Sequence, residues 1–312
     1  MGHDHAHAHG HEPGHAHVHA PASYGKAFAI GACLNLGFVI VEAFYGAVSH
    51  SVALVADAAH NLGDVLGLLA AWAAFALAKR RPTAKRTYGL RKSTVLAALA
   101  NAVLLLVAVG GVAWESIGKL RDPQPIQTGT VMVVAAVGVV VNGCSALLFA
   151  RGGKTDANMR AVFLHLAADA LVSLAVVVSG AVISYTSWLW LDPAVSLVVS
   201  LIILVATWKL LVKSVNLALD AVPEHVDAAA LLRHLNALPG VTEVHDFHVW
   251  AMSTTESAMT AHLVLQDAAH PAPFLADLGR DLHARFGVDH TTVQIEPASS
   301  AHECMLCPEG AL

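Results

Sequence analysis

The chain has 312 residues, of which 56% are hydrophobic and 13% are charged, and its mean hydropathy is +0.59. Soluble globular domains carry about 25% charged residues, so this composition is typical of a membrane protein. The formal net charge is −5. Beyond Val215 acidic residues clearly outnumber the three basic ones, Arg233, Arg280 and Arg285. An acidic domain attracts cations and repels nucleic acid, so no nucleic-acid partner is expected.

Residues 1–22 alternate histidine with small residues. The histidines are His3, His5, His7, His9, His11, His15, His17 and His19. A tract of this composition cannot build a packed core, so it predicts a disordered cytosolic tail that collects metal. An affinity tag is the alternative. The irregular spacing, interrupted by Asp4, Glu12 and Pro13, favours a native segment.

Six apolar segments follow and predict an all-α transmembrane bundle over residues 23–214. They are Lys26–Val48, Val52–Ala78, Thr94–Ile117, Gly129–Ala150, Ala157–Tyr185 and Pro193–Val212. Each is near or above the ~20 residues that a spanning helix needs. We therefore expect an integral membrane protein that contacts lipid.

The basic residues of the connecting loops orient this bundle. Seven of them, with no acid among them, separate the second and third segments: Lys79, Arg80, Arg81, Lys85, Arg86, Arg91 and Lys92. Three more lie between the fourth and fifth segments, whereas the opposite side has only Lys119 and Arg121. The positive-inside rule places both basic loops, and with six spans both termini, in the cytoplasm.

Residues 215–298 have the pattern of a soluble α+β domain in the order α-β-β-α-β. The expected helices are Val226–Ala237 and Pro273–Phe286, and the expected strands are Val244–Met252, Ala258–Leu265 and Thr291–Ile295. With a short initial strand or extended link near Ala218–Val222, this order is ferredoxin-like. Residues 299–312 then form a C-terminal tail.

Two pairs with the spacing His-x-x-x-Asp lie inside apolar segments: His60 with Asp64, and His165 with Asp169. Residues i and i+4 share one face of a helix. Two such pairs on facing helices would present two imidazoles and two carboxylates to one point, a ligand set that suits Zn²⁺ and its neighbours. Because a carboxylate at membrane depth is costly unless it is paired or functional, the pairs predict a transport site for a divalent metal.

Asp57 lies on the same helical stripe as His60 and Asp64, one turn toward the outer face. We expect it to line the pathway rather than to ligate metal. Glu42, in the first segment, is a structural or pathway acid. A polar seam that joins helices is the alternative for the Asp57 stripe, although Asn, Ser and Thr suffice for that at about 1 kcal/mol per hydrogen bond.

The soluble domain offers further candidate ligands in His245, His248 and His262. Alternation along a strand places His245 with Phe247 on one face and His248 on the other. Either histidine, paired across the sheet with His262, would make a surface zinc site. Ordinary polarity of a strand face is the alternative.

The C-terminal tail contains Cys304-x-x-Cys307 beside His302. Thiolates at this spacing bind Zn²⁺ tightly, so these three residues are a second candidate set. The missing ligand could come from His270, from the histidine tail or from a second protomer. No organic cofactor is expected.

Together these motifs resemble the cation diffusion facilitators, in particular the bacterial zinc, cadmium and cobalt efflux branch. The matching pieces are Asn35…Glu42, Ser51–Asp64, Tyr88–Arg91, His165…Asp169, Leu191–Pro193, His245–Trp250 and Ala261–His262. The resemblance implies a homodimer in a bacterial inner membrane, with ferredoxin-like cytosolic domains that meet at the dimer, and metal/proton antiport.

The resemblance also assigns roles to individual residues. It carries the two His-x-x-x-Asp pairs onto the transport site, and His245 and His262 onto cytosolic metal positions. Some members place His-x-Asp in the final strand, where this chain has Gln294 and Glu296. In this chain the terminal Cys-x-x-Cys could provide the metal ligands that His-x-Asp provides in those members.

Chemistry links the predicted site to protons. Metal binds deprotonated ligands, so metal and protons compete for one site, and histidine titrates near neutrality. We expect a secondary transporter, not an enzyme, that exports Zn²⁺ (with Cd²⁺ and Co²⁺ as further candidates) in exchange for protons. A membrane sensor or buffer that binds metal without transporting it is the alternative.

Overall fold

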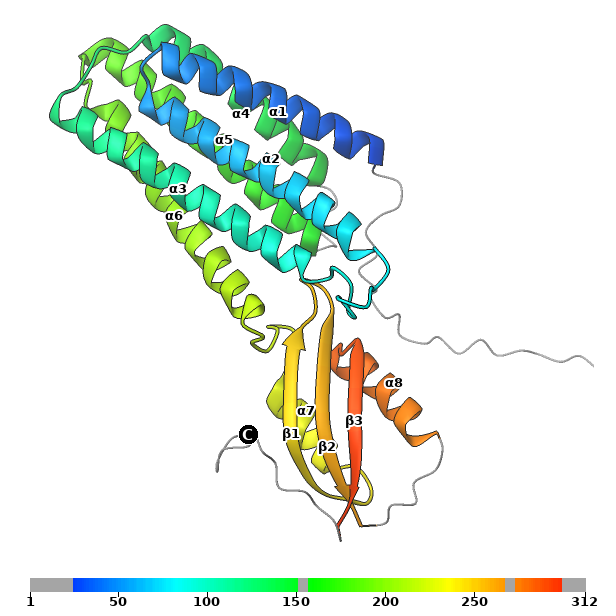
Figure 1. Ribbon diagram of the computed structural model, residues 1–312. Helices are drawn as coiled ribbons and strands as arrows, with labels where there is room; N and C mark the ends of the chain where they lie inside the picture. Colours follow the sequence, from blue (N-terminus) through cyan, green and yellow to red (C-terminus); the bar gives the residue numbers. More distant parts are fainter. Residues whose placement is uncertain (1–24, 151–156, 267–272, 299–312) are drawn as a thin grey trace, which may run out of the picture.

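The computed structural model describes residues 25–150, 157–266 and 273–298. Six long helices form a bundle (Figure 1). They are α1 Gly25–Val48, α2 Val52–Ala78, α3 Ser93–Arg121, α4 Thr128–Ala150, α5 Ala157–Thr186 and α6 Leu191–Ala218. Helices α2 to α6 are long and apolar enough to cross a membrane, and α1 adds a sixth apolar helix. The six predicted segments are confirmed, with α3 and α6 continuing past their predicted ends to Arg121 and Ala218.

Helix α2 is central to the bundle, because it packs against α1, α3, α5 and α6. Two glycines allow the close approach to α3. A Cβ built on Gly63 would lie 2.0 Å from Leu105 Cδ2, and one on Gly67 would lie 2.6 Å from Asn101 Nδ2. Small residues at such crossings let helix backbones approach within a membrane. The helix that holds half of the predicted transport site is therefore fixed on several sides.

The first turn of α2 is held by a buried carboxylate from α6. Asp192, which is 1% exposed, accepts hydrogen bonds from Ser51 Oγ at 2.5 Å and from Val52 N at 2.8 Å. Ser51 also caps its own helix by accepting from Leu54 N at 3.2 Å. The first N–H groups of a helix lack intrahelical partners, so Asp192 satisfies α2 and fixes its position against α6.

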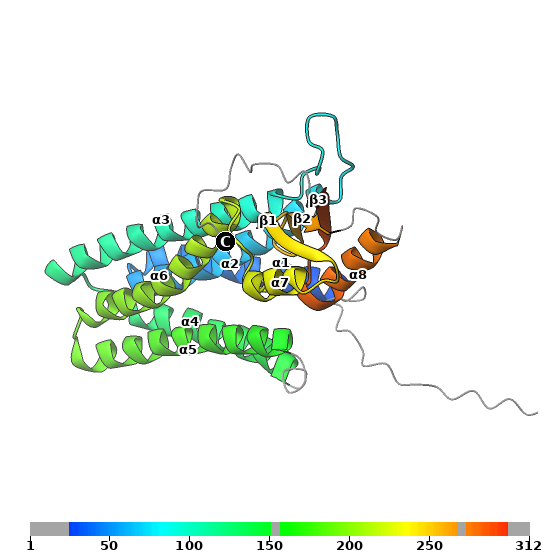
Figure 2. The ribbon, with the colours of Figure 1, turned by 90° about the horizontal axis from the view of Figure 1, so that it is seen from below.

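The second domain packs two helices on one face of a three-stranded sheet. Its elements are α7 Ala228–Asn236, β1 Val241–Ala251, β2 Ser257–Leu265, α8 Phe274–Phe286 and β3 His290–Pro297. The strand order is β1-β2-β3, with β1 and β2 antiparallel and β2 and β3 parallel. Both helices, α7 and α8, lie on the same side of the strands (Figure 2). One core joins the helices to the sheet through Leu231, Leu235, Met259, Leu263 and Leu282. The predicted α-β-β-α-β order is confirmed, and residues 219–222, which follow α6, form a link rather than a strand.

The two domains contact each other at the loop between α2 and α3. Arg91 forms an ion pair with Glu256 at 2.9 Å, and the N–H of Thr254 donates to Thr94 Oγ1 at 3.0 Å. Lys92 forms an ion pair with Asp220, just after α6. The turn between β1 and β2 therefore rests on the end of the bundle that carries the basic loop.

The Asp192 contact predicts a specific stability loss. Asp192→Ala removes the acceptor of two buried donors, so it should lower the free energy of unfolding by about 1–3 kcal/mol. Thermal denaturation of the detergent-solubilised protein measures this as a lower Tm. Asp122→Ala is the control, because that exposed side chain accepts only from Gln124. Equal melting temperatures for the two variants would contradict the assigned role.

Candidate functional site

Helices α2 and α5 bring the two His-x-x-x-Asp pairs together. His60 Nε2 lies 3.3 Å from Asp169 Oδ1 on the facing helix and 3.7 Å from Asp64 Oδ2 on its own helix. His165 Nε2 lies 3.2 Å from Asp64 Oδ2 and 3.7 Å from Asp169 Oδ2. Each imidazole therefore contacts both carboxylates, and the rings meet edge to face with centroids 6.0 Å apart.

This arrangement suits a small dication. Ligand atoms of His60, Asp64 and Asp169 all lie within 4.8 Å of one another, and His165 adds a fourth donor beside both carboxylates. Two carboxylates and two neutral imidazoles carry a net charge of −2, which a divalent ion neutralises. Asp169 is buried, whereas the His165 side chain is 50% exposed, so the site opens on the His165 side. That these four residues bind metal stays a prediction.

Asp57 lies outside this ring of contacts. Its Oδ2 accepts from Ser173 Oγ of α5 at 2.7 Å, and its Oδ1 accepts from Asn61 Nδ2 at 3.4 Å. The same Asn61 amide donates to Glu42 Oε2 of α1 at 3.2 Å. Asp57 is therefore part of a buried polar network one helical turn from the four residues, toward the start of α2.

A second group of potential metal ligands lies on the face of the sheet that α7 and α8 do not cover. His245 and His262 are paired across β1 and β2, with ring centroids 5.2 Å apart. Glu296 of β3 completes the group, because its Oε1 lies 2.9 Å from His262 Nδ1 and its Oε2 lies 3.6 Å from His245 Nε2. These three residues could hold a metal ion. Sequence reasoning treated Glu296 only as a departure from His-x-Asp, although its place in the last strand was the available signal.

The expected faces of β1 were wrong. The pairing register shifts between His245 and His248, and Asp246 adopts a left-handed backbone with φ 49°. This bulge interrupts alternation. As a result Phe247 packs against the helical core while His245 lies beside His262 on the other face.

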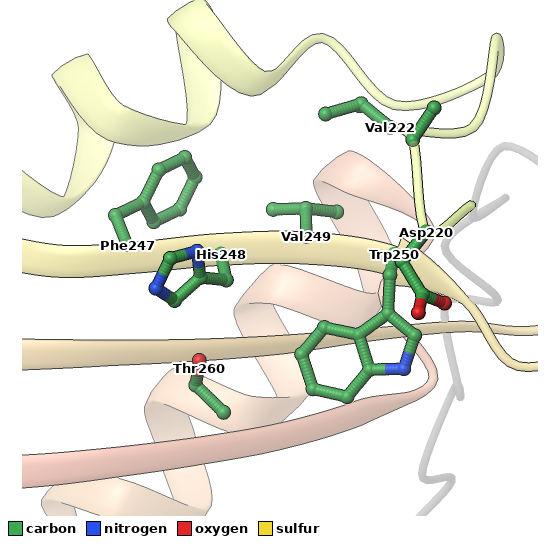
Figure 3. Close-up of a pocket in the computed structure, with 8 residues that line it drawn as sticks. Asp220, Val222, Phe247, His248, Val249, Trp250 and Thr260 are labelled. Carbon is green, nitrogen blue, oxygen red and sulfur yellow. The ribbon is translucent and has the colours of Figure 1, made fainter. Parts of the chain in front are cut away.

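Asp246 connects His248 to this group. His248 Nε2 lies 2.9 Å from Asp246 Oδ1, and Asp246 Oδ2 lies 3.4 Å from His262 Nε2. Phe247 and His248 leave β1 in different directions beside a groove of about 520 Å³ (Figure 3). The groove lies between β1 and the link after α6, and none of His245, His262 and Glu296 lines it, so the groove and the three-residue group are separate.

The remaining sequence candidates lie outside the described residues. These are the histidine tract in 1–22, His270, and the C-terminal set His302, Cys304 and Cys307. Their proposed metal binding stays a prediction from sequence.

Comparison with known proteins covers nearly the whole chain. The family model of the cation efflux transmembrane domain matches residues 28–217, and that of the cation efflux protein cytoplasmic domain matches residues 223–298. The metal cation efflux system protein CzcD of Cupriavidus metallidurans is 35% identical over 299 residues, covering 96% of this chain and 91% of that protein. The zinc transporter ZitB of Escherichia coli is 36% identical over 266 residues, covering 84% of each.

Two further matches add detail. The cadmium, cobalt and zinc/H(+)-K(+) antiporter of Bacillus velezensis is 28% identical over 313 residues, covering 98% of this chain and 96% of that protein. Among solved structures, the metal-bound C-terminal domain of the CzcD transporter is 35% identical and covers 23% of this chain and 99% of that chain, with a TM-score of 0.21.

The position of Glu296 predicts its effect on metal binding by the group that it forms with His245 and His262. Glu296→Ala should weaken Zn²⁺ binding there by at least about tenfold, because even a supporting residue of a metal site changes affinity about 10- to 100-fold. Competition with a chromogenic chelator, in a chain that also carries Asp64→Ala, measures this change.

Glu243→Ala is the matched control for Glu296→Ala. Its carboxylate lies 3.6 Å from His245 Nδ1 but is 65% exposed, and an exposed pair contributes at most about 1 kcal/mol. If both substitutions weakened Zn²⁺ binding equally, Glu296 would not be a ligand.

Proposed function

This chain belongs to the cation diffusion facilitator family, and we propose that it exports Zn²⁺ in exchange for protons through His60, Asp64, His165 and Asp169. It is an integral membrane protein, and metal cation efflux is the activity that the family and its relatives support. The observation that carries the finer proposal is the convergence of both imidazoles on both carboxylates at the contact of α2 and α5.

Zn²⁺ is the preferred substrate because of the donor set. Two imidazole nitrogens and two carboxylate oxygens provide the four ligands that Zn²⁺ binds in a tetrahedron. Cd²⁺ and Co²⁺ are further candidates, since selectivity among such ions depends on geometry and availability as well as on ligand type. The zinc, cadmium and cobalt names of the relatives support this substrate class.

Proton exchange follows from charge balance within the site. A nitrogen that carries a proton cannot ligate metal, so metal binding requires deprotonated ligands. The carboxylates of Asp64 and Asp169 can be neutralised by two imidazolium groups or by one dication, but not by both. Loss of metal to one side of the membrane therefore favours uptake of protons at His60 and His165, and their release favours metal binding.

We further propose a bacterial inner-membrane location with both termini in the cytoplasm. The basic loop between α2 and α3 supports this orientation, and it places the acidic second domain in the cytosol. There His245, His262 and Glu296 would hold a resident Zn²⁺. The match to the cytoplasmic-domain family supports a homodimer that meets through these domains.

Two alternatives make different predictions. A metal sensor would bind Zn²⁺ without moving it, which flux measurement tests directly. A membrane metalloenzyme would need His-Glu-x-x-His on a helix. The sequence contains this pattern at residues 11–15, but Pro13 and Gly14 lie between the two histidines, a composition that disfavours a helix.

Transport predicts gradient-dependent flux that requires the four residues. Zn²⁺ uptake into proteoliposomes under an imposed pH gradient should be fast for the unaltered chain and should fall at least about tenfold in Asp64→Ala or Asp169→Ala, since each removes a ligand. Asp122→Ala, on an exposed loop, should transport normally.

The outcomes of the flux experiment separate the hypotheses. Flux that ignored the pH gradient would contradict proton exchange. Flux that survived in both aspartate variants would contradict the assigned site, and Zn²⁺ binding without any flux would favour the sensor.

A further inference from the structure

The four residues of the proposed metal site do not include the buried acid Glu42. It lies on α1 and is 0% exposed, as is Asp57 on α2, and the amide of Asn61 donates to both carboxyl groups, at 3.2 Å to Glu42 Oε2 and at 3.4 Å to Asp57 Oδ1. Among the described residues neither group forms an ion pair, and the contacts that they receive come from the neutral donors Asn61 and Ser173. Two adjacent carboxylates without a cation are thus enclosed inside the bundle.

Two negative charges cannot both persist there. An unpaired carboxylate at membrane depth costs several kcal/mol, and a second like charge beside it adds Coulomb repulsion that a low-dielectric interior strengthens. One proton shared by the pair removes most of this cost, since the protonated group can donate a hydrogen bond to the ionised one. The buried pair therefore binds a proton in the described state.

The hydrogen-bond pattern identifies which residue carries the proton. Both oxygens of Asp57 accept from donors, Ser173 on Oδ2 and Asn61 on Oδ1. Glu42 Oε2 accepts from Asn61, whereas Glu42 Oε1 is buried and has no donor. A proton on Glu42 Oε1 would turn that partnerless acceptor into a donor and remove one of the two negative charges.

This pair is adjacent to the metal-binding residues without including them. Asn61, which donates to both carboxyl groups, directly follows His60 in α2, and Ser173 lies one helical turn from Asp169 in α5. Helix α4, which also packs on α1, contains no acidic, basic or histidine residue. The charged groups around Glu42 are therefore Asp57 and, beyond it, His60 and Asp169.

We propose that Glu42 is a second proton-binding site of the transport cycle. It holds a proton shared with Asp57 while the His60–Asp64–His165–Asp169 site is free of metal, and it releases that proton to solvent when a dication binds one turn away. The added positive charge stabilises the ionised carboxylate pair, so release is electrostatic and needs no contact with the metal. This inference rests on the proposed exchange of metal for protons and assigns one of those protons to α1.

Proton counting on the full chain tests the proposal. Protons released when Zn²⁺ is added to detergent-solubilised protein are measured in a weakly buffered solution with a pH indicator. The same measurement on the chain with Asp64→Ala counts the protons released at all other zinc sites. Subtracting this count from that of the chain with Asp64 gives the protons released at the transport site. Glu42→Gln keeps the size of the side chain and donates to Asp57 permanently, and Asp57→Asn leaves a single carboxyl group.

Glu42→Gln and Asp57→Asn should each lower the Asp64-dependent proton release by about one proton per Zn²⁺ bound. Each leaves only one ionisable carboxyl group in the pair, so no proton needs to be shared. Glu115→Gln, an exposed glutamate on α3, should leave this release unchanged. An unchanged count in both Glu42→Gln and Asp57→Asn would overturn the proposal while leaving proton exchange at the histidines intact. If the unaltered chain released no Asp64-dependent proton, the proposed function itself would fail.

A measurement on the unaltered chain tests the proposal even if the substituted chains do not fold. Infrared difference spectra of the unaltered chain, with and without Zn²⁺, should show loss of a protonated carboxyl band on metal binding. Labelling glutamate with ¹³C should shift this band, because Glu42 is the buried glutamate of the six-helix bundle among the described residues. A zinc-sensitive band that did not shift, or no such band, would contradict proton release from Glu42.

Discussion

The neutralisation of buried carboxylates is the constraint on which the structure of the bundle depends. Five of the carboxyl groups on α2 and its partner helices are balanced in three ways. Asp192 accepts from the first turn of α2, Asp64 and Asp169 meet two imidazoles, and Asp57 accepts from Ser173 and Asn61 beside Glu42. Because a membrane interior offers no water to solvate these charges, their partners must come from the helices, from protons or from the transported ion.

This constraint explains why α2 lies at the centre of the bundle. Asp192 fixes its first turn, Gly63 and Gly67 let α3 approach closely, and the face that carries His60 and Asp64 is directed at α5. A site whose ligands come from two helices is sensitive to their relative position, so a small shift between α2 and α5 would change all four contacts together. Each pair lies on one helix, so a movement between α2 and α5 would change the contacts between the pairs more than the contacts within them.

The sequence predicts those features that depend on periodicity within one element. The lengths of the six helices and the common face of His60 and Asp64 follow from apolar runs and from i, i+4 spacing. The face of His245 could not be predicted, because the bulge at Asp246 is a property of strand pairing. Glu296 and Glu42 acquire their roles from neighbours far along the chain. Their positions in the last strand and in an apolar segment mark them as candidates, but a single sequence does not show which residues they contact.

In the proposed transport site, each of the helices α2 and α5 contributes one imidazole and one carboxylate to the same metal ion. X-ray absorption spectroscopy of bound Zn²⁺ examines this ligand set, in a chain without residues 1–22 and 299–312 that also carries His262→Ala to remove the other candidate sites. We expect nitrogen and oxygen ligands at about 2.0–2.2 Å, with scattering from two imidazoles and none from sulfur. A spectrum with a single imidazole, or with a sulfur ligand, would contradict this ligand set.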